Sequence, residues 1–439
     1  MELKSSLLSS LIAQYKGNEI ISKGSIAFLF KVIGSLLGYF FLILVTRKSG
    51  AEVWGVFALC LALLNITSIF SRMGIDIAIL KYISSVKHDL AKAKAIYIKG
   101  ISLVLPLSII FTLLLYVFSE FIAIHIFSKV QLSKYIQLIS FAIIPFSIVY
   151  VNAQSFRGLK KISHFAFFQH VSKFLFAIIF FLGISLFSNF SIQTNTFYAF
   201  IAALYFAMIV SVLMLKKEDT FVKAKSPISS RNLFTTAFPM MLSTSILLIM
   251  SWADSIIIGI FKTEIDIGIY NVAIKLAMIS GIVLGAVNSI VAPKISNAYN
   301  NGKHEEFKCI VYQSTRIIFF LSFPILIFLL VFPEFLLSFF GQEFILGKQT
   351  LYILLIGQII NSLSGSVGVI MQMTGKEKVF QNILILALIL NISLNFILIP
   401  IYGIEGAAIA SSASIIFWNL TSVTYIYKNH QVLTFFNFK

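Results

Sequence analysis

The positions of the basic residues relative to the long apolar stretches constrain this chain most. The sequence contains about twelve stretches of roughly 20 mostly apolar residues, the length that a helix needs to cross a bilayer. Of the 34 Lys and Arg residues, 25 lie at the chain ends and in alternate connectors, six lie in the other connectors, and three lie inside the stretches. Because cytoplasmic loops carry the excess of Lys and Arg, this bias predicts a multi-pass membrane protein with both ends in the cytoplasm.

The composition agrees with a membrane protein. Hydrophobic residues make up 59% of the chain and charged residues 12%, whereas soluble proteins contain about 25% charged residues. The net charge of +17 follows from the topology, so we expect anionic membrane lipids, and no nucleic acid, as partners. The two cysteines, Cys60 and Cys309, predict neither a disulfide framework nor a metal site.

Polar segments divide the chain into two lobes of six apolar stretches each. We expect an amphipathic segment on the inner membrane surface over residues 1–24, a first lobe over 25–215 and a second lobe over 235–427. The longest polar stretch in mid-chain, 216–234, is predicted to be a cytoplasmic linker, and 428–439 a cytoplasmic tail. The expected fold is therefore all-α, with about twelve transmembrane helices.

Short similarities between the two halves indicate an internal repeat. Gly55 follows the first stretch and Gly268 the seventh, in similar surroundings and 213 residues apart. Gly158 and Gly375 end the fourth and tenth stretches and are 217 residues apart. An even number of predicted spans separates the copies, so the repeat is parallel. Transporters built from repeats place their cargo site between the halves.

Three lysines inside predicted spans are candidate ligand-binding residues: Lys31, Lys173 and Lys275. A charge at the centre of a membrane helix costs at least ~2.5–3.5 kcal/mol, so such residues usually serve a function. Each lies on a helix face with small or polar residues, which favours a hydrated cavity and an anionic cargo. The alternative is that Lys31 and Lys173 extend to the lipid headgroups, and that Gly34 and Gly38 beside Lys31 serve helix packing.

Other charged residues have two interpretations each. Arg72, at the inner edge of the second stretch, is a further candidate cation for the cargo, but Asp76 lies at i+4 and would form a local ion pair with it. Asp254 is predicted to lie at the depth of Lys275, so it is either a structural partner of that lysine or a proton- or cation-coupling group. His170 can titrate near neutral pH, although a lone histidine is usually hydrogen-bonded.

Three amide residues in the tenth stretch are candidates for contact with sugar. Gln358, Asn361 and Gln372 share one face of a continuous helix with Gly365 and Gly368. Sugar hydroxyl groups need both donors and acceptors, and amides provide both. Hydrogen bonding between helices is the alternative.

The eleventh and twelfth stretches carry a specific pattern. Residues 391–408 read N-I-S-L-N-F-I-L-I-P-I-Y-G-I-E-G-A-A, which resembles the N-x-x-L-N-x-x-L-I-P-x-Y-G-x-x-G-A-A pattern of the oligosaccharide flippases, the Wzx-type polysaccharide transporters. Residues 22–84, with G-A-E-V-W-G at 50–55 and G-I-D at 74–76, look like the opening of the same family. The resemblance extends over nearly the whole chain.

The resemblance implies a V-shaped, two-lobed fold shared with multidrug extruders and lipid II flippases. It also implies a substrate, an undecaprenyl-diphosphate-linked oligosaccharide that moves from the inner to the outer leaflet of the bacterial cytoplasmic membrane by alternating access. A cationic cavity would bind the diphosphate. Polysaccharide polymerase machinery would be a partner, and no cofactor is implied.

Two other functions stay open. A cation-coupled multidrug extruder of the same fold would rely on Asp254, and its lysines would be incidental. A membrane polysaccharide polymerase or glycosyltransferase would need a sizeable outer loop or an acidic catalytic motif, whereas the outer connectors here are short. We therefore expect a transporter with no catalytic residues.

Overall fold

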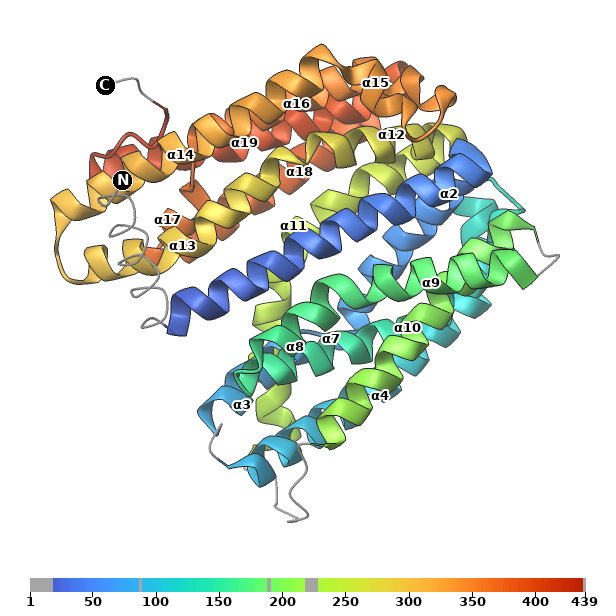
Figure 1. Cartoon of the computed structure of the whole chain (residues 1–439), viewed down its shortest axis with the longest axis horizontal. Helices are drawn as coiled ribbons and strands as arrows, with labels where there is room; N and C mark the ends of the chain where they lie inside the picture. The colour runs from blue at the N-terminus through green and yellow to red at the C-terminus, as the bar shows by residue number, and fades with distance from the viewer. Residues whose placement is uncertain (1–18, 87–88, 188–190, 218–227, 437–439) are drawn as a thin grey trace, which may run out of the picture.

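The structure is a computed structural model that describes residues 19–86, 89–187, 191–217 and 228–436. Within these ranges the chain is helical almost throughout and contains no strand (Figure 1), which confirms the predicted all-α fold. Most of the predicted amphipathic segment 1–24 and most of the predicted linker 216–234 lie outside the described residues.

The helices follow one another with short connections. Those of the first half are α2 (Glu19–Arg72), α3 (Ile75–Ser85), α4 (Leu90–Val117), α5 (Ser119–Phe121), η1 (Ile122–Ile126), α6 (Leu132–Ser140), α7 (Ile143–Gly158), α8 (Ile162–Ala166), η2 (Phe167–Val171), α9 (Ser172–Phe187) and α10 (Ile192–Lys216). Those of the second half are α11 (Ser230–Phe261), α12 (Glu264–Ala277), α13 (Ser280–Asn300), α14 (His304–Val331), α15 (Pro333–Ser338), η3 (Gln342–Gly347), α16 (Lys348–Ser364), α17 (Val367–Met373), α18 (Glu377–Tyr402) and α19 (Ile404–His430).

Many of these helices are long enough to cross a membrane. Among the described residues, nine are sufficiently long and apolar, or ten if α12 and α13, which are bent by 44°, count as one span. The first two predicted stretches form the single element α2, which is interrupted by non-helical dihedral angles at Gly50. The protein is thus a multi-pass membrane protein, while the number of twelve crossings stays a prediction.

The helices form two groups that diverge (Figure 1). One group contains α3–α10, the other contains α12–α19, and the first part of α2 lies between them. The groups are close together at the end where α2 bends, which we call the closed end, and further apart at the opposite, open end. We refer to the groups as the N-lobe and the C-lobe.

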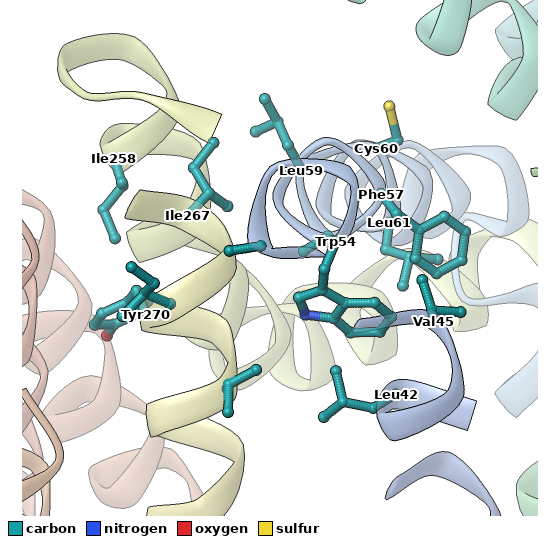
Figure 2. Packing of buried hydrophobic residues seen from close by; sticks show 14 of the residues in the cluster. Leu42, Val45, Trp54, Phe57, Leu59, Cys60, Leu61, Ile258, Ile267 and Tyr270 are labelled. Atoms are coloured by element: carbon teal, nitrogen blue, oxygen red, sulfur yellow. The ribbon is translucent and has the colours of Figure 1, made fainter. Parts of the chain in front are cut away.

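The second part of α2 packs tightly against α12. A Cβ atom added at Gly55 would collide with the carbonyl oxygen of Glu264, and one added at Gly268 would collide with that of Ala51. Only glycine permits such close backbone contact. The contact is reciprocal, because each glycine faces the residue that lies four positions before the other glycine. Figure 2 shows the apolar core here, with Trp54 between the two parts of α2.

Helix α11 connects the lobes. Its first turns lie on the N-lobe, where Thr236 forms a 2.8 Å hydrogen bond with Tyr82 on α3. Just before the helix, the carbonyl oxygen of Ile228 accepts a 2.8 Å hydrogen bond from Lys99 on α4. Its last turns lie on the C-lobe, against α18. The first residues of the predicted second lobe therefore contact the N-lobe.

Candidate functional site

The three predicted lysines gather where the lobes face each other. The ammonium nitrogen of Lys31, on α2, lies 3.1 Å from the position that a Cβ would take at Gly285 on α13. Lys173, on α9, is within electrostatic range of both Lys275 on α12 and His170 on η2, and Lys31 is within range of His170. The backbone oxygen of Lys275 accepts a 2.6 Å hydrogen bond from Tyr39 of α2. We call Lys31, Lys173 and Lys275 the lysine cluster.

The lysine cluster has no protein counter-ion in the described part of the chain. No ion pair joins any of its three ammonium groups to another described residue. Lys31 is exposed, Lys173 and Lys275 are partly buried, and the Lys173 ammonium lies 5.0 Å from the centre of the Phe174 ring. Cations that are partly buried and unpaired suit an anionic ligand.

The small residues beside Lys31 serve helix packing. A Cβ at Gly34 would collide with the backbone oxygen of His170, and one at Gly38 would lie 3.2 Å from the Phe174 ring. This close contact between α2 and η2–α9 brings Lys31 near Lys173. The side chain of His170 makes no hydrogen bond with another described residue, and both interpretations of this histidine stay predictions.

The C-lobe contains a cavity of about 500 Å3 between α11, α12, α13, α16, α18 and α19. Four residues predicted from the sequence line it: Asp254, Lys275, Gln358 and Asn361. The structure therefore brings together the acid, one member of the lysine cluster and two of the three predicted amides. We call this space the C-lobe cavity.

Asp254 is buried among neutral donors. Its carboxylate accepts hydrogen bonds from Tyr270 (2.5 Å), Asn395 (2.7 Å), Asn391 (3.3 Å) and Ser411. No ion pair joins it to Lys275 or to another described cation, so the predicted Asp254–Lys275 pair is wrong. The reason is that similar depth in the membrane does not fix the direction in which two side chains point.

None of the four donors around Asp254 was among the residues predicted from the sequence. Asn391 and Asn395 belong to the pattern at 391–408, and their i, i+4 spacing places both on one face of an apolar helix. Two amides on one face of a membrane helix are a signal of a buried polar partner. The two asparagines therefore indicated that α18 has a buried polar partner, but they did not indicate that this partner is Asp254 on α11.

Arg72 and Asp76 form a buried ion pair within the N-lobe. Their side chains are 3.2 Å apart, and both residues are buried. The guanidinium of Arg72 lies 4.2 Å from the centre of the Tyr150 ring, and its Nε donates to the backbone oxygen of Ser68. Asp76 thus balances the charge of Arg72, which favours the local ion pair over cargo binding by Arg72.

Gln372 is separated from the other two amides. Helix α16 ends at Ser364, and Gly365 has φ +70° and ψ −146° before α17 begins. Because the helix is broken there, the predicted common face is wrong, and Gln372 is exposed on α17 instead of lining the C-lobe cavity.

Contacts at the closed end join the lobes. The Lys129 ammonium of the N-lobe lies 3.6 Å from the Glu264 carboxylate and donates a 2.7 Å hydrogen bond to the backbone oxygen of Lys262. Glu343 of the C-lobe accepts a 2.6 Å hydrogen bond from the backbone N–H of Ala51. We call these five residues the latch. Burial lowers the pKa of Lys129 although Glu264 acts in the opposite direction.

Solved structures share this architecture. An inward-facing MATE family transporter of the MOP superfamily superposes with a TM-score of 0.74 at 14% identity, covering 94% of this chain and 98% of the other. Lipid II flippase MurJ, in an inward closed conformation, gives 0.73 at 17% identity, covering 92% of this chain and 87% of MurJ. An outward-facing MATE transporter gives 0.62 at 14% identity, with 94% and 96% covered. The fold is therefore that of a V-shaped MOP superfamily transporter.

Comparisons of the sequence give the family within this fold. The family model described as polysaccharide biosynthesis protein matches residues 20–298, and the MatE model matches residues 239–397. A Haloferax volcanii relative named as the low-salt glycan biosynthesis flippase Agl15 is 27% identical over 390 residues, which are 88% of this chain and 79% of the relative. A Shigella flexneri relative named as an O-antigen transporter is 24% identical over 405 residues, 87% and 93% of the two chains.

The match to the first family model identifies the family of this chain. The chain belongs to the polysaccharide biosynthesis protein family, whose model matches well over half of its residues. The resemblance seen in the sequence is thereby confirmed.

Proposed function

We propose that this protein is a flippase that moves undecaprenyl-diphosphate-linked oligosaccharide units from the inner to the outer leaflet of the bacterial cytoplasmic membrane. The observation that carries the proposal is the lysine cluster, in which both lobes contribute ammonium groups without a described counter-ion. The named relatives, a glycan flippase and an O-antigen transporter, support the same substrate class.

The lysine cluster would bind the diphosphate between the lobes. A diphosphate loses the hydration of the headgroup layer when it enters the membrane, and ammonium groups replace that hydration. The prenyl chain stays in the lipid, because transfer of its methylene groups out of lipid is unfavourable. Outward movement of the anion from a negative interior releases ~2.3 kcal/mol per charge per 100 mV, so no nucleotide hydrolysis is needed.

The latch would set the direction of access. With the basic connectors and both termini in the cytoplasm, the open end faces the cytoplasm and admits the headgroup to the lysine cluster. Opening of the latch and closure of the opposite end then expose the headgroup to the outer face. A polysaccharide polymerase that acts on the outer leaflet would take up the unit.

Asp254 favours a second candidate, a cation-coupled multidrug extruder. Its carboxylate is buried, lines the C-lobe cavity and has no described cation partner. The MatE match at 239–397 covers this region. In such a protein, a proton or an organic cation would bind at Asp254.

Reconstitution in liposomes separates the two functions. The purified full chain is reconstituted with fluorescent undecaprenyl-diphosphate oligosaccharide, and a reagent that quenches only the outer leaflet measures lipid movement. A parallel assay measures uptake of a cationic dye, and protein-free liposomes serve as the control. We expect lipid movement without dye uptake. Dye uptake without movement of the lipid would reject the flippase and support the extruder.

A further inference from the structure

The C-lobe cavity has the composition of a carbohydrate site. Its lining combines two indole rings, Trp252 and Trp418, with the amides Gln358, Asn361 and Asn271. We propose that this cavity binds the sugar that is attached directly to the diphosphate. The proposal rests on the proposed function, since it names the part of the same substrate that enters this lobe.

A relay of amides leaves a free donor in the cavity. Asn419 donates to the backbone oxygen of Ile415 (2.9 Å) and to Oδ1 of Asn361 (3.2 Å), which fixes the orientation of both amides. Asn361 therefore directs its nitrogen to Oε1 of Gln358, at 3.4 Å. The Gln358 nitrogen has no hydrogen-bond partner among the described residues, so its two N–H groups are available to a ligand.

Two amide oxygens beside the cavity have no hydrogen-bond partner among the described residues. Asn391 directs its nitrogen to the Asp254 carboxylate, so its Oδ1 points elsewhere, and that oxygen is buried without a partner. Asn271 directs its nitrogen to Ser255 at 3.5 Å, and its Oδ1 is also buried without a partner. Both oxygens are closed off from the cavity, so a hydroxyl group of a ligand would reach them only after a small rotation of the amide, which would relieve the cost of an unsatisfied buried acceptor.

The tryptophans suit the apolar face of a sugar ring. Trp252 lies on α11 and Trp418 on α19, and both are partly exposed. The Phe380 ring meets the Trp418 ring edge-on at 6.0 Å, which holds the indole in place. Aromatic rings add binding energy through preferred stacking geometry beyond the burial of area.

Lys275 connects this cavity to the diphosphate. It belongs to the lysine cluster and also lines the C-lobe cavity. In the glycolipid the first sugar is bonded directly to the diphosphate. A diphosphate held at Lys275 therefore places that sugar beside the indoles and the Gln358 nitrogen.

Binding titrations with two probes test this inference. The full chain in lipid nanodiscs is titrated with undecaprenyl diphosphate and with undecaprenyl diphosphate that carries one N-acetylhexosamine. We expect the sugar to tighten binding about 10-fold, as two good polar contacts and a stacking contact allow. In Gln358→Leu, and in the double variant Trp252→Leu with Trp418→Leu, the preference falls below about 2-fold while the affinity for the sugar-free probe is unchanged.

Gln372→Leu is the matched control, because it makes the same chemical change at an exposed amide outside the cavity, and we expect it to keep the 10-fold preference. Equal affinities of the wild type for both probes would overturn the sugar site but leave the flippase intact. An undiminished preference in both cavity variants would overturn it as well. Failure of the wild type to bind either probe would overturn the proposed function and, with it, this inference.

Discussion

Each lobe buries one acidic side chain among its described helices, and the two are stabilised differently. In the N-lobe, Asp76 is neutralised by Arg72 at 3.2 Å, four residues earlier on the chain. In the C-lobe, Asp254 has no described cation partner and accepts hydrogen bonds from four neutral donors on three other helices.

This difference indicates a structural role for the Arg72–Asp76 pair and a ligand-dependent role for Asp254. In a buried ion pair the two charges neutralise each other, so a further ion binds there only if the pair breaks. A carboxyl group that is held only by hydroxyl and amide groups has no opposite charge beside it, so a proton or a cation can still bind there. The N-lobe pair is therefore a structural element, while Asp254, beside the C-lobe cavity, can respond to a ligand.

The largest effect on stability is expected at the N-lobe pair. Arg72→Leu leaves Asp76 buried without a partner, which should destabilise the protein by about 3–5 kcal/mol. Thermal unfolding of the purified protein in detergent measures the loss. The double variant Arg72→Leu with Asp76→Leu removes both charges and should recover most of the stability. Equal stability of Arg72→Leu and the wild type would contradict a structural role.

A smaller effect on stability is expected at Asp254. Asp254→Asn keeps the shape and removes the charge, so stability should change by only about 1 kcal/mol, the value of one hydrogen bond. If Asp254 couples transport to a cation, lipid movement in the variant should no longer respond to an imposed proton or sodium gradient. Response equal to that of the wild type would reject a coupling role.

The smallest effect is expected at the latch. Lys129→Gln removes a partly exposed ion pair worth about 0.5 kcal/mol, so the population that is open at the closed end should rise about 2-fold. Spin labels on the two sides of the closed end measure this population by their distances.

The latch should also depend on pH. Burial lowers the pKa of Lys129, so this ammonium loses its proton at a lower pH than an ordinary lysine does. Rising pH should therefore weaken the wild-type latch before exposed lysines titrate, and Lys129→Gln should remove this dependence. A distance distribution that is insensitive both to the substitution and to alkaline pH would show that the latch does not hold the closed end.

The sequence predicted features that depend on local composition. The length of the apolar stretches predicted the membrane helices, and the lysines inside these stretches predicted the lysine cluster. The direction of side chains between helices was not predictable, because it depends on rotation and tilt. For this reason the pair of Asp254 with Lys275 was wrong, and Asn391 and Asn395 were recognised only as a family pattern.

Single residues that break a helix also limited the prediction. Gln358 and Asn361 lie on the predicted helix and reach the C-lobe cavity. Gln372 does not, because Gly365 takes a positive φ and ends the periodicity on which the common face depended.

The most direct test of the flippase is the movement of fluorescent undecaprenyl-diphosphate oligosaccharide by a variant with Lys31→Gln, Lys173→Gln and Lys275→Gln. The control carries the same three charge changes at the exposed residues Lys92, Lys303 and Lys378. We expect the rate to fall about 100-fold or more in the first variant, since each charge-assisted contact with the diphosphate contributes about 1.5–3 kcal/mol, and to stay near wild type in the control. A folded triple variant that moves the lipid at the wild-type rate would contradict diphosphate binding by the lysine cluster.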